Sequence, residues 1–314
     1  MPATAVETDA DGYRSLLFSI AYGMTGSVGD AEDIVQDAFL GLTRARRAGT
    51  PVVNLKAYLT TAVTRLGINY LGSARVRRET YVGDWLPEPV VVSADRPGPA
   101  EHAELSDSLS MAFLVLLEAL SPVERAVFVL REVFGYGYPE VARLTGKSEA
   151  NCRQIFARAR KRIAPGGQAV DSPSPGRRAE SEELARKFFA AAEGGDMEAL
   201  LGMLAPDVVF QGDGGGKARA LARSVTDARR VAQLLVGGLR RVGRLGACLE
   251  AVRVNGRPGG VIYDAEGRVA SVIEVDIAEG RIQAIRSVSN PDKLDHLGPV
   301  SDLGRLPERR AADH

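Results

Sequence analysis

The sequence predicts a multidomain chain in which two all-α domains, the second with a helix-turn-helix, are followed by an α+β domain. Apolar residues recur at helical spacing through the first half of the chain and alternate with polar ones near its end. Two stretches rich in proline and glycine divide the pattern. The length of 314 residues also exceeds what one average domain needs.

These breaks set the expected boundaries. We expect a first α domain, a linker, a second α domain, a second linker, an α+β domain and a disordered polar tail, at 1–82, 83–105, 106–164, 165–179, 180–298 and 299–314.

Charge is balanced over the whole chain and polarised locally. Forty basic and forty acidic side chains cancel, so net charge does not indicate a nucleic-acid partner. Residues 65–78 and 150–162 carry several arginines and no acid, whereas residues 30–37 carry four acids and no base. Such segregation suggests surfaces that meet different partners.

The cysteines and the apolar stretches indicate the compartment. Cys152 and Cys248 lie far apart and fit no metal spacing, so we expect reduced thiols and neither a metal nor a cofactor. The N-terminus has no apolar signal core, and no stretch approaches ~18 apolar residues. The sequence predicts a cytoplasmic protein without a membrane partner.

The first domain is expected to be helical from residue 12 to residue 80. Between Asp30 and Leu40 the apolar side chains fall on one helical face, and Asp30, Asp33 and Asp37 fall on another. Breakers around Gly49–Pro51 predict a loop, and a helix from about Leu55 to Arg75 turns from apolar to basic. Four prolines then predict an extended linker, which contains the single tryptophan, Trp85.

The second domain has the signature of a helix-turn-helix. Ser121, Pro122 and Glu124 predict a capped helix start, and a short helix is expected near 140–144. Thr145–Ser148 predicts a turn, after which a final helix covers Glu149–Ile163.

That final helix has the chemistry of a DNA-reading element. Arginine matches guanine in the major groove, and asparagine or glutamine matches adenine. Basic residues farther along suit phosphates, and an apolar anchoring face is supplied by Cys152, Ile155, Phe156 and Ala159. The candidate reading residues are Lys147, Ser148, Asn151, Arg153, Gln154 and Arg158.

The last domain begins with helices at about 180–193 and 196–204. A strand at Val208–Gln211, a glycine-rich turn and a helix at about 224–243 follow. Strict alternation over 269–277, with turns at 255–256, 264–267 and 279–280, predicts antiparallel hairpins.

Several segments resemble a known family. Gly29–Phe39 (GDAEDIVQDAF) and Asn54–Leu59 (NLKAYL) resemble the second domain of extracytoplasmic-function, or group-four, RNA polymerase sigma factors, and Leu120–Arg125 and Gly146–Gln154 resemble the fourth. Trp85–Pro89 (WLPEP), Asp213–Lys217 (DGGGK) and Asn290–Leu294 (NPDKL) resemble three signatures of one subgroup. That subgroup carries a cone-shaped SnoaL-like domain at its C-terminus, and the likeness covers about residues 12–297.

The resemblance implies bacterial transcription initiation, with the RNA polymerase core and promoter DNA as partners. Asp30, Asp33, Gln36 and Asp37 would contact the β′ clamp, and the fourth domain would contact the β flap and the minus-thirty-five element. Residues 41–56 would form a loop that captures a flipped base. The minus-ten element would be held by Arg65, Asn69, Arg75, Arg77 and Arg78, although Asn69 stands where the family often has an acid.

The three subgroup signatures imply regulation within the chain. The expected interdomain residues are Trp85, Leu86, Pro87, Glu88, Pro89, Asp213, Lys217, Asn290, Pro291, Asp292 and Lys293. The hypothesis is that the last domain holds the two sigma domains in a compact, restrained state.

Two other functions stay open. A ligand-responsive regulator could bind DNA without polymerase, and the last domain could be a cyclase-like or isomerase-like enzyme with Asp213 as its base. No histidine is expected in the pocket strands, and Gly214–Gly216 lacks the phosphate-loop spacing, so we expect no catalytic residue. A small-molecule ligand for this domain is a third open question.

Overall fold

The computed structural model describes residues 10–79, 81–92, 109–163, 175–221 and 223–304, without the side chains of 74–79 and 175. The chain divides into two compact units. Unit 1 comprises Met1–Glu79 and Pro97–Asp171, and unit 2 comprises Thr80–Arg96 and Ser172–His314. The linker around Trp85 therefore folds with the C-terminal part of the chain.

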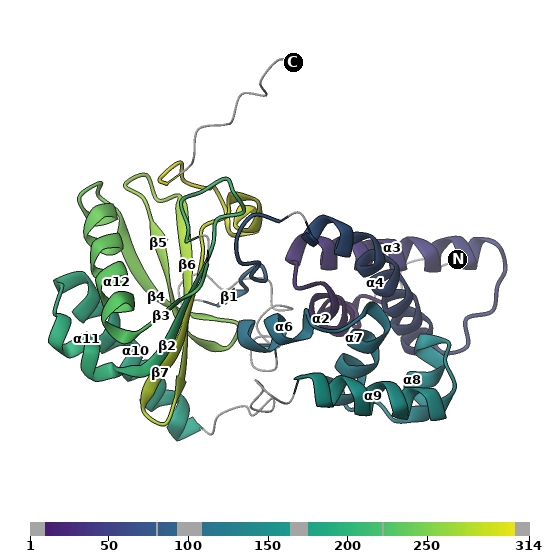
Figure 1. Cartoon of the computed structure of the whole chain (residues 1–314). Helices are drawn as coiled ribbons and strands as arrows, with labels where there is room; N and C mark the ends of the chain where they lie inside the picture. The colour runs from purple at the N-terminus through teal and green to yellow at the C-terminus, as the bar shows by residue number, and fades with distance from the viewer. Residues whose placement is uncertain (1–9, 80, 93–108, 164–174, 222, 305–314) are drawn as a thin grey trace, which may run out of the picture. The chain divides into compact units, whose positions relative to one another are not determined.

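Unit 1 is helical over its described residues (Figure 1). Its elements are α2 (Arg14–Thr25), α3 (Val28–Arg47), α4 (Leu55–Glu79), α6 (Met111–Leu117), α7 (Pro122–Phe128), the π-helix η1 (Val129–Val133), α8 (Tyr138–Thr145) and α9 (Glu149–Ile163). The helix expected over Glu149–Ile163 is confirmed, and α8 begins two residues earlier than expected because Gly137 and Glu140 form its N-terminal cap.

The helix starts in unit 1 follow from local capping chemistry. The Ser27 hydroxyl accepts a hydrogen bond from the Asp30 backbone N–H at 3.1 Å, which starts α3. At the start of α7, the Ser121 N–H and hydroxyl donate to Glu124 at 3.0 and 2.8 Å, so the predicted capping box is confirmed. Desolvation works to raise the pKa of Glu124, but these bonds and the Arg162 guanidinium hold it below its usual value.

Unit 2 is a curved sheet with helices on one face (Figure 1). The helices on that face are α10 (Pro175–Gly194), α11 (Met197–Met203) and α12 (Ala228–Gly243). The short 3-10 helices η2 (Pro291–Lys293) and η3 (Asp295–Leu297) follow the last strand. The strands are β1 (Val91–Val92), β2 (Leu204–Asp213), β3 (Val225–Thr226), β4 (Cys248–Val254), β5 (Arg257–Tyr263), β6 (Val269–Ala278) and β7 (Arg281–Val288).

The sheet order is β1-β4-β5-β6-β7-β2-β3. The hairpins of β4 through β7 are antiparallel as predicted, with Asn255 and Glu279 at positive φ in two of the turns. Strand β2 runs parallel to β7, an arrangement that the hairpin pattern did not predict. The linker adds β1 to the edge of the sheet, where Val91 pairs with Val254.

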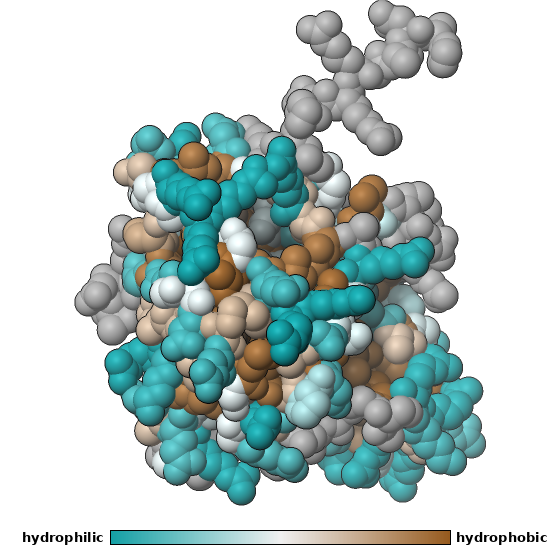
Figure 2. All heavy atoms as spheres, turned by 60° about the vertical axis from the view of Figure 1, so that its left-hand side comes forward, coloured by the Kyte–Doolittle hydropathy of each residue, from teal (hydrophilic) through white to brown (hydrophobic). Residues whose placement is uncertain are grey.

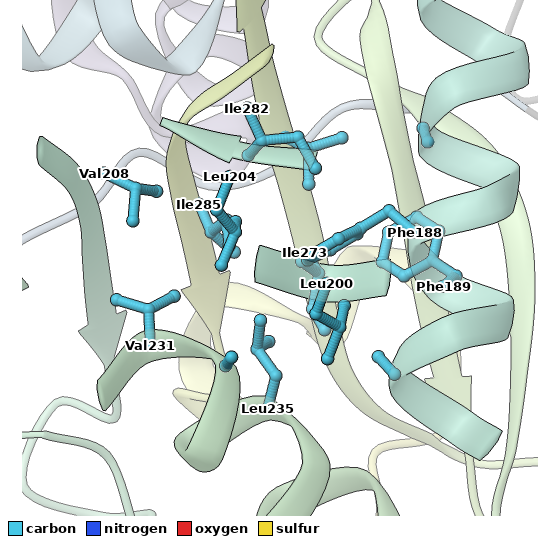
Figure 3. Close-up of a cluster of buried hydrophobic side chains, with 14 of the residues drawn as sticks. Phe188, Phe189, Leu200, Leu204, Val208, Val231, Leu235, Ile273, Ile282 and Ile285 are labelled. Carbon is cyan, nitrogen blue, oxygen red and sulfur yellow. The ribbon is translucent and has the colours of Figure 1, made fainter. Parts of the chain in front are cut away.

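The core of unit 2 lies between the sheet and its helices (Figure 3). Its central side chains include Phe188, Phe189, Leu200, Leu204, Val208, Val231, Leu235, Ile273, Ile282 and Ile285. On the outer side of the helices, apolar surface lies in patches among hydrophilic side chains (Figure 2). The helix-facing side of the sheet is thus largely filled by the protein itself.

Two predicted boundaries of unit 2 were wrong. Residues 175–179 belong to helix α10 and not to a linker, because a proline is well suited to the first position of a helix. Residues 299–304 belong to the domain and not to a disordered tail, since the Ser301 N–H bonds to the Val269 carbonyl at 2.8 Å and the Ser301 hydroxyl to Asp264 at 2.6 Å. The expected tail beyond Gly304 lies outside the described residues.

No helix among the described residues is long and apolar enough to cross a membrane.

Candidate functional site

The acidic face of α3 is the first candidate surface. Buried Ala31, Ile34, Val35, Ala38 and Leu42 fix the helix against its neighbours. Asp33, Gln36 and Asp37 are exposed on the opposite face, as the helical spacing predicted. Asp30 is half-buried and accepts a hydrogen bond from the Tyr70 hydroxyl of α4. Three of the four predicted side chains are therefore exposed, and the fourth, Asp30, is bound by Tyr70.

The loop after α3 is shorter than the resemblance implied. Helix α3 continues to Arg47, so residues 41–47 are helical and the connecting segment is 48–54. Three arginines in the last turn favour this extension because cations stabilise the C-terminal end of a helix dipole. The expectation of a loop over 41–56 was therefore wrong in its first part and at its end, where Leu55 already begins α4.

Helix α4 carries the predicted minus-ten residues. Arg65 and Asn69 are exposed on it, one turn apart. Arg75, Arg77 and Arg78 lie in its last turns, but their side chains are outside the described residues. Arg65 also lines a cavity of about 580 Å³ between α4 and α8, together with Tyr58, Tyr136 and Glu140. Part of the predicted DNA surface thus borders a cleft inside unit 1.

Helix α9, the predicted DNA-reading element, has the expected division into two faces. Cys152, Ile155, Ala159 and Ile163 are buried. Lys147, Ser148, Arg153, Gln154 and Arg158 are exposed, and Asn151 is half-buried. The Ser148 hydroxyl accepts from the Asn151 N–H at 3.3 Å, which caps the helix where it would enter a groove.

Two arginines of α9 already have partners inside unit 1. The Arg153 guanidinium lies 3.1 Å from Glu149 and 5.1 Å from the ring centroid of Tyr138, so it must leave these contacts to reach a base. Arg162 pairs with Glu124 at 2.8 Å and thereby ties the end of α9 to the start of α7.

In unit 2, Asp213 anchors the linker. Its carboxylate is buried at the end of β2 and pairs with the Lys293 ammonium at 2.7 Å. It also accepts hydrogen bonds from the Tyr81 hydroxyl at 2.5 Å and from the Leu86 N–H at 2.8 Å. The three signature segments therefore meet at one carboxylate, and we call this group, Tyr81, Leu86, Asp213, Asn290 and Lys293, the linker dock.

Lys293 closes the linker dock from the other side. Its ammonium donates to the Leu86 carbonyl and lies 4.3 and 4.8 Å from the ring centroids of Trp85 and Tyr81. Asn290 donates to the Tyr81 oxygen at 2.8 Å. Burial, and then the Asp213 carboxylate, raise the pKa of Tyr81, so its phenol stays protonated and remains a donor.

Glycines make room for this arrangement. A Cβ at Gly215, where φ is +57°, would lie 2.3 Å from the Asn290 side chain, and one at Gly214 would lie 2.3 Å from the Ala218 carbonyl. A Cβ at Gly216 would lie 3.2 Å from Val82 of the linker. The glycines thus let this loop approach the linker and Asn290 closely.

Other linker residues bond to the rest of unit 2 through the backbone of Pro89 and Val90 and through the side chain of Asp84. The Asn255 side chain accepts from the Val90 N–H at 3.0 Å, and the Asn255 N–H donates to the Val90 carbonyl at 2.8 Å. The His296 ring lies 2.8 Å from the Pro89 carbonyl, and the Ser224 hydroxyl donates to Asp84 at 2.9 Å. Among these residues the sequence predicted Pro89 as a contact and Asn255 as part of a turn. It did not predict contacts for Asp84, Val90, Ser224, His296 and Tyr81.

The other predicted interdomain residues lie around the linker dock. Pro87 and Pro89 are buried and Glu88 is half-buried. Lys217 pairs with Asp292 at 2.6 Å on the surface, which joins two of the signature segments, and Pro291 is buried at the start of η2. Among the described residues, no group of three histidine, cysteine or acidic side chains could hold a metal ion.

Two family models match the chain. The model of sigma-70 region 2 matches residues 10–77, and that of sigma-70 region 4 matches residues 110–163. The extracytoplasmic-function (ECF) RNA polymerase sigma factor SigJ of Mycobacterium tuberculosis H37Rv is 34% identical over 98% of each chain. This chain is an extracytoplasmic-function sigma factor.

Further relatives agree. A probable ECF sigma factor, SigI, of Mycobacterium tuberculosis CDC 1551 is 33% identical over 91% of this chain and 93% of that one. The crystal structure of Mycobacterium tuberculosis SigJ superposes with a TM-score of 0.74, covering 94% of this chain and 99% of that chain at 33% identity. The sigma factor belongs to the subgroup with a SnoaL-like C-terminal domain, and it directs RNA polymerase to promoters for transcription initiation.

Proposed function

We propose that unit 2 regulates this sigma factor by holding the segment that connects its two promoter-binding regions. The observation that carries the proposal is the buried Asp213–Lys293 pair, which binds the backbone of Leu86. Leu86 lies between the matches to region 2 and region 4. Fixing the linker there limits how far the two regions can separate.

The length of the linker gives the proposal a scale. The segment between residues 77 and 110 could span on the order of 100 Å if fully extended. When residues 81–92 are held on unit 2, the free segment between β1 and region 4 is residues 93–109. Fully extended, it spans about 55 Å. A coupling of ~1–3 kcal/mol between docking and promoter engagement shifts the population several-fold.

Within this proposal the surfaces of unit 1 have separate partners. Asp30, Asp33, Gln36 and Asp37 bind the β′ clamp, and region 4 binds the β flap. Arg65, Asn69, Arg75, Arg77 and Arg78 contact the minus-ten element, and Lys147, Ser148, Asn151, Arg153, Gln154 and Arg158 contact the minus-thirty-five element. The protein acts in the cytoplasm, where polymerase and promoters are.

Unit 2 acts as a regulator and not as an enzyme. A general base needs lone pairs that face a substrate and a pKa near the working pH. The Asp213 carboxylate instead faces Lys293, Tyr81, Leu86 and the Gly215 N–H at 3.0 Å. With these partners, the carboxylate holds the linker in place.

Run-off transcription with purified polymerase core tests the proposal. Full-length Asp213→Asn should change transcript yield several-fold relative to the parent chain, and Asp207→Asn, an exposed acid on the same strand, should not. The milder Tyr81→Phe keeps the test informative if Asp213→Asn folds poorly. Equal yields from all chains would exclude regulation through the linker dock.

A gel-shift experiment distinguishes a polymerase-dependent initiation factor from a regulator that binds DNA without polymerase. We expect the full chain to retard promoter DNA only when polymerase core is present, and Arg153→Ala to reduce that shift. Retardation without polymerase at equal strength would favour a DNA-binding regulator that acts alone.

A further inference from the structure

A cavity of about 460 Å³ lies in unit 2, apart from the linker dock. Phe210 and Gly212 of β2 and Ser287 of β7 form part of its wall. Phe210 pairs with Ile285 of the core and Gly212 with Ser287, so alternation along the strands puts the Phe210 and Ser287 side chains on the helix-facing side of the sheet. The cavity continues that side beyond the filled core, and its volume is typical of small-molecule sites.

The sheet changes chemistry where the cavity begins. In the core, the helix-facing positions of β6 and β7 are Ile273 and Ile285. Toward the cavity these positions are Ser271 of β6 and Ser287 of β7, and Ser289 follows just after β7. The Ser271 hydroxyl lies 3.0 Å from that of Ser287 and 3.1 Å from that of Ser289. A hydroxyl has one donor and two acceptor sites, so Ser287 and Ser289 keep hydrogen-bonding capacity toward the cavity.

Helix α12 forms the opposite wall of the cavity and has two glycines there. Gly237 and Gly238 stand in the middle of this helix and line the cavity. Each glycine costs a helix about 1 kcal/mol relative to alanine. A Cβ at either position meets no described atom within 4 Å, so protein packing does not explain the pair. The two glycines leave this part of the cavity wall without side chains.

The charged side chains of the cavity have one sign. Arg219 and Arg241 lie on its wall, and no acidic residue does. Phe210, Leu221 and Leu234 supply apolar surface, and Gln233 supplies an amide. This combination fits a molecule with an apolar ring system and an acidic group that faces the arginines.

The cavity is connected to the linker dock by single peptide steps. Gly212 precedes Asp213, and Ser289 precedes Asn290. The N–H groups of Ser289 and Asn290 donate to the Asp213 carbonyl at 2.7 and 3.0 Å. A molecule in contact with Gly212 and Ser289 would therefore touch the residues directly before Asp213, at the end of β2, and Asn290, at the N-cap of η2.

We propose that this cavity binds a small organic anion with an apolar ring system, and that its occupancy alters how the linker is held. The first part stands by itself, and the second rests on the proposed function of the linker dock.

Anilinonaphthalene sulfonate, a fluorescent ring compound with one anionic group, is the probe. We expect the full-length chain to bind it at one site, with energy transfer from Trp85, the single tryptophan. Gly238→Leu fills the cavity and should weaken binding about tenfold. Gly202→Leu, at an exposed glycine of α11, should leave binding unchanged.

A second pair of variants tests the charge. Arg241→Glu should weaken binding several-fold, and Arg244→Glu, one turn later and outside the cavity wall, should not. Circular dichroism of every variant excludes probe binding to unfolded chain. Equal affinity of Gly238→Leu and Gly202→Leu, or no binding by the parent chain, would overturn the site.

The coupling has its own readout. We expect bound probe to change the acrylamide quenching of Trp85 in the parent chain and not in Gly238→Leu. Binding without this change would overturn the coupling and keep the cavity. Neither measurement involves transcription, so failure of the proposed function would be seen separately.

Discussion

The recognition helix of unit 1 and the linker dock of unit 2 use polar residues in opposite ways. On α9, Arg153, Gln154 and Arg158 are exposed, and a buried apolar face sets their position. In the linker dock, Asp213 and Lys293 are 1% and 7% exposed and hold each other. The exposed side chains of α9 can exchange partners at a small cost in free energy. In the buried Asp213–Lys293 pair, removal of one charge leaves the other buried without a counter-charge, which destabilises the fold.

The largest effect is expected from Asp213→Asn. The amide keeps the shape of the carboxylate but leaves the Lys293 ammonium buried without its counter-charge, which costs about 3–5 kcal/mol. Urea unfolding followed by Trp85 fluorescence measures this loss. Asp207→Asn should change the free energy of unfolding by less than about 0.5 kcal/mol. Similar values for the two variants would contradict the difference between buried and exposed sets.

Arg153→Ala should have the next largest effect, on promoter binding and not on folding. Loss of one bidentate base contact costs about 1–3 kcal/mol of discrimination between promoter sequences. Holoenzyme binding to promoters with single substitutions in the minus-thirty-five element measures it. Arg186→Ala removes an arginine with a similar exposed acidic partner in unit 2, and it should leave promoter discrimination unchanged.

Tyr81→Phe tests the contribution of a single hydroxyl in the linker dock. The change removes hydrogen bonds to Asp213 and Asn290 and should cost about 1–2 kcal/mol of unfolding free energy. Combined with Asp213→Asn it should cost less than the sum of the two single changes, because both remove the same contact. Strict additivity would show that Tyr81 and Asp213 do not act together.

Lys217→Ala should have a small effect although the ion pair it removes also joins signature segments. Lys217 and Asp292 are more than half exposed, and exposed pairs contribute ~0–1 kcal/mol. The same urea titration measures it. A loss as large as that of Asp213→Asn would show that the surface pair, and not the buried one, holds the segments together.

A pH dependence is expected where the C-terminal segment joins the sheet. Desolvation opposes the shift, but hydrogen bonds from Ser301 and Arg268 hold the pKa of Asp264 at about 2, below its ordinary 3.8. A carboxyl with a lowered folded-state pKa stabilises the fold above its unfolded pKa and loses that contribution as pH falls. The difference in Tm between the parent chain and Asp264→Asn should therefore shrink from about pH 4 to about pH 2. A difference independent of pH in this window would contradict it.

Local features could be predicted well from the sequence. The capping box at Ser121, the two faces of α9 and the hairpin turns at Asn255-Gly256 and Glu279-Gly280 depend on residues a few positions apart. The predicted exposure of Asp33 and Asp37 follows from helical periodicity alone. The motifs also predicted that segments around Trp85, Asp213 and Asn290 act together.

The contacts between those segments depend on the tertiary structure. The bonds of Leu86 to Asp213, of Val90 to Asn255 and of Pro89 to His296 join residues 127, 165 and 207 positions apart. No local pattern encodes such separations, because they depend on the parallel pairing of β2 with β7 and on β1 entering the sheet. Helices, caps, turns and exposed faces follow from the sequence alone, because they depend on neighbouring residues. The tertiary structure was needed to place the buried Lys293 ammonium beside the Asp213 carboxylate, because these residues are 80 positions apart.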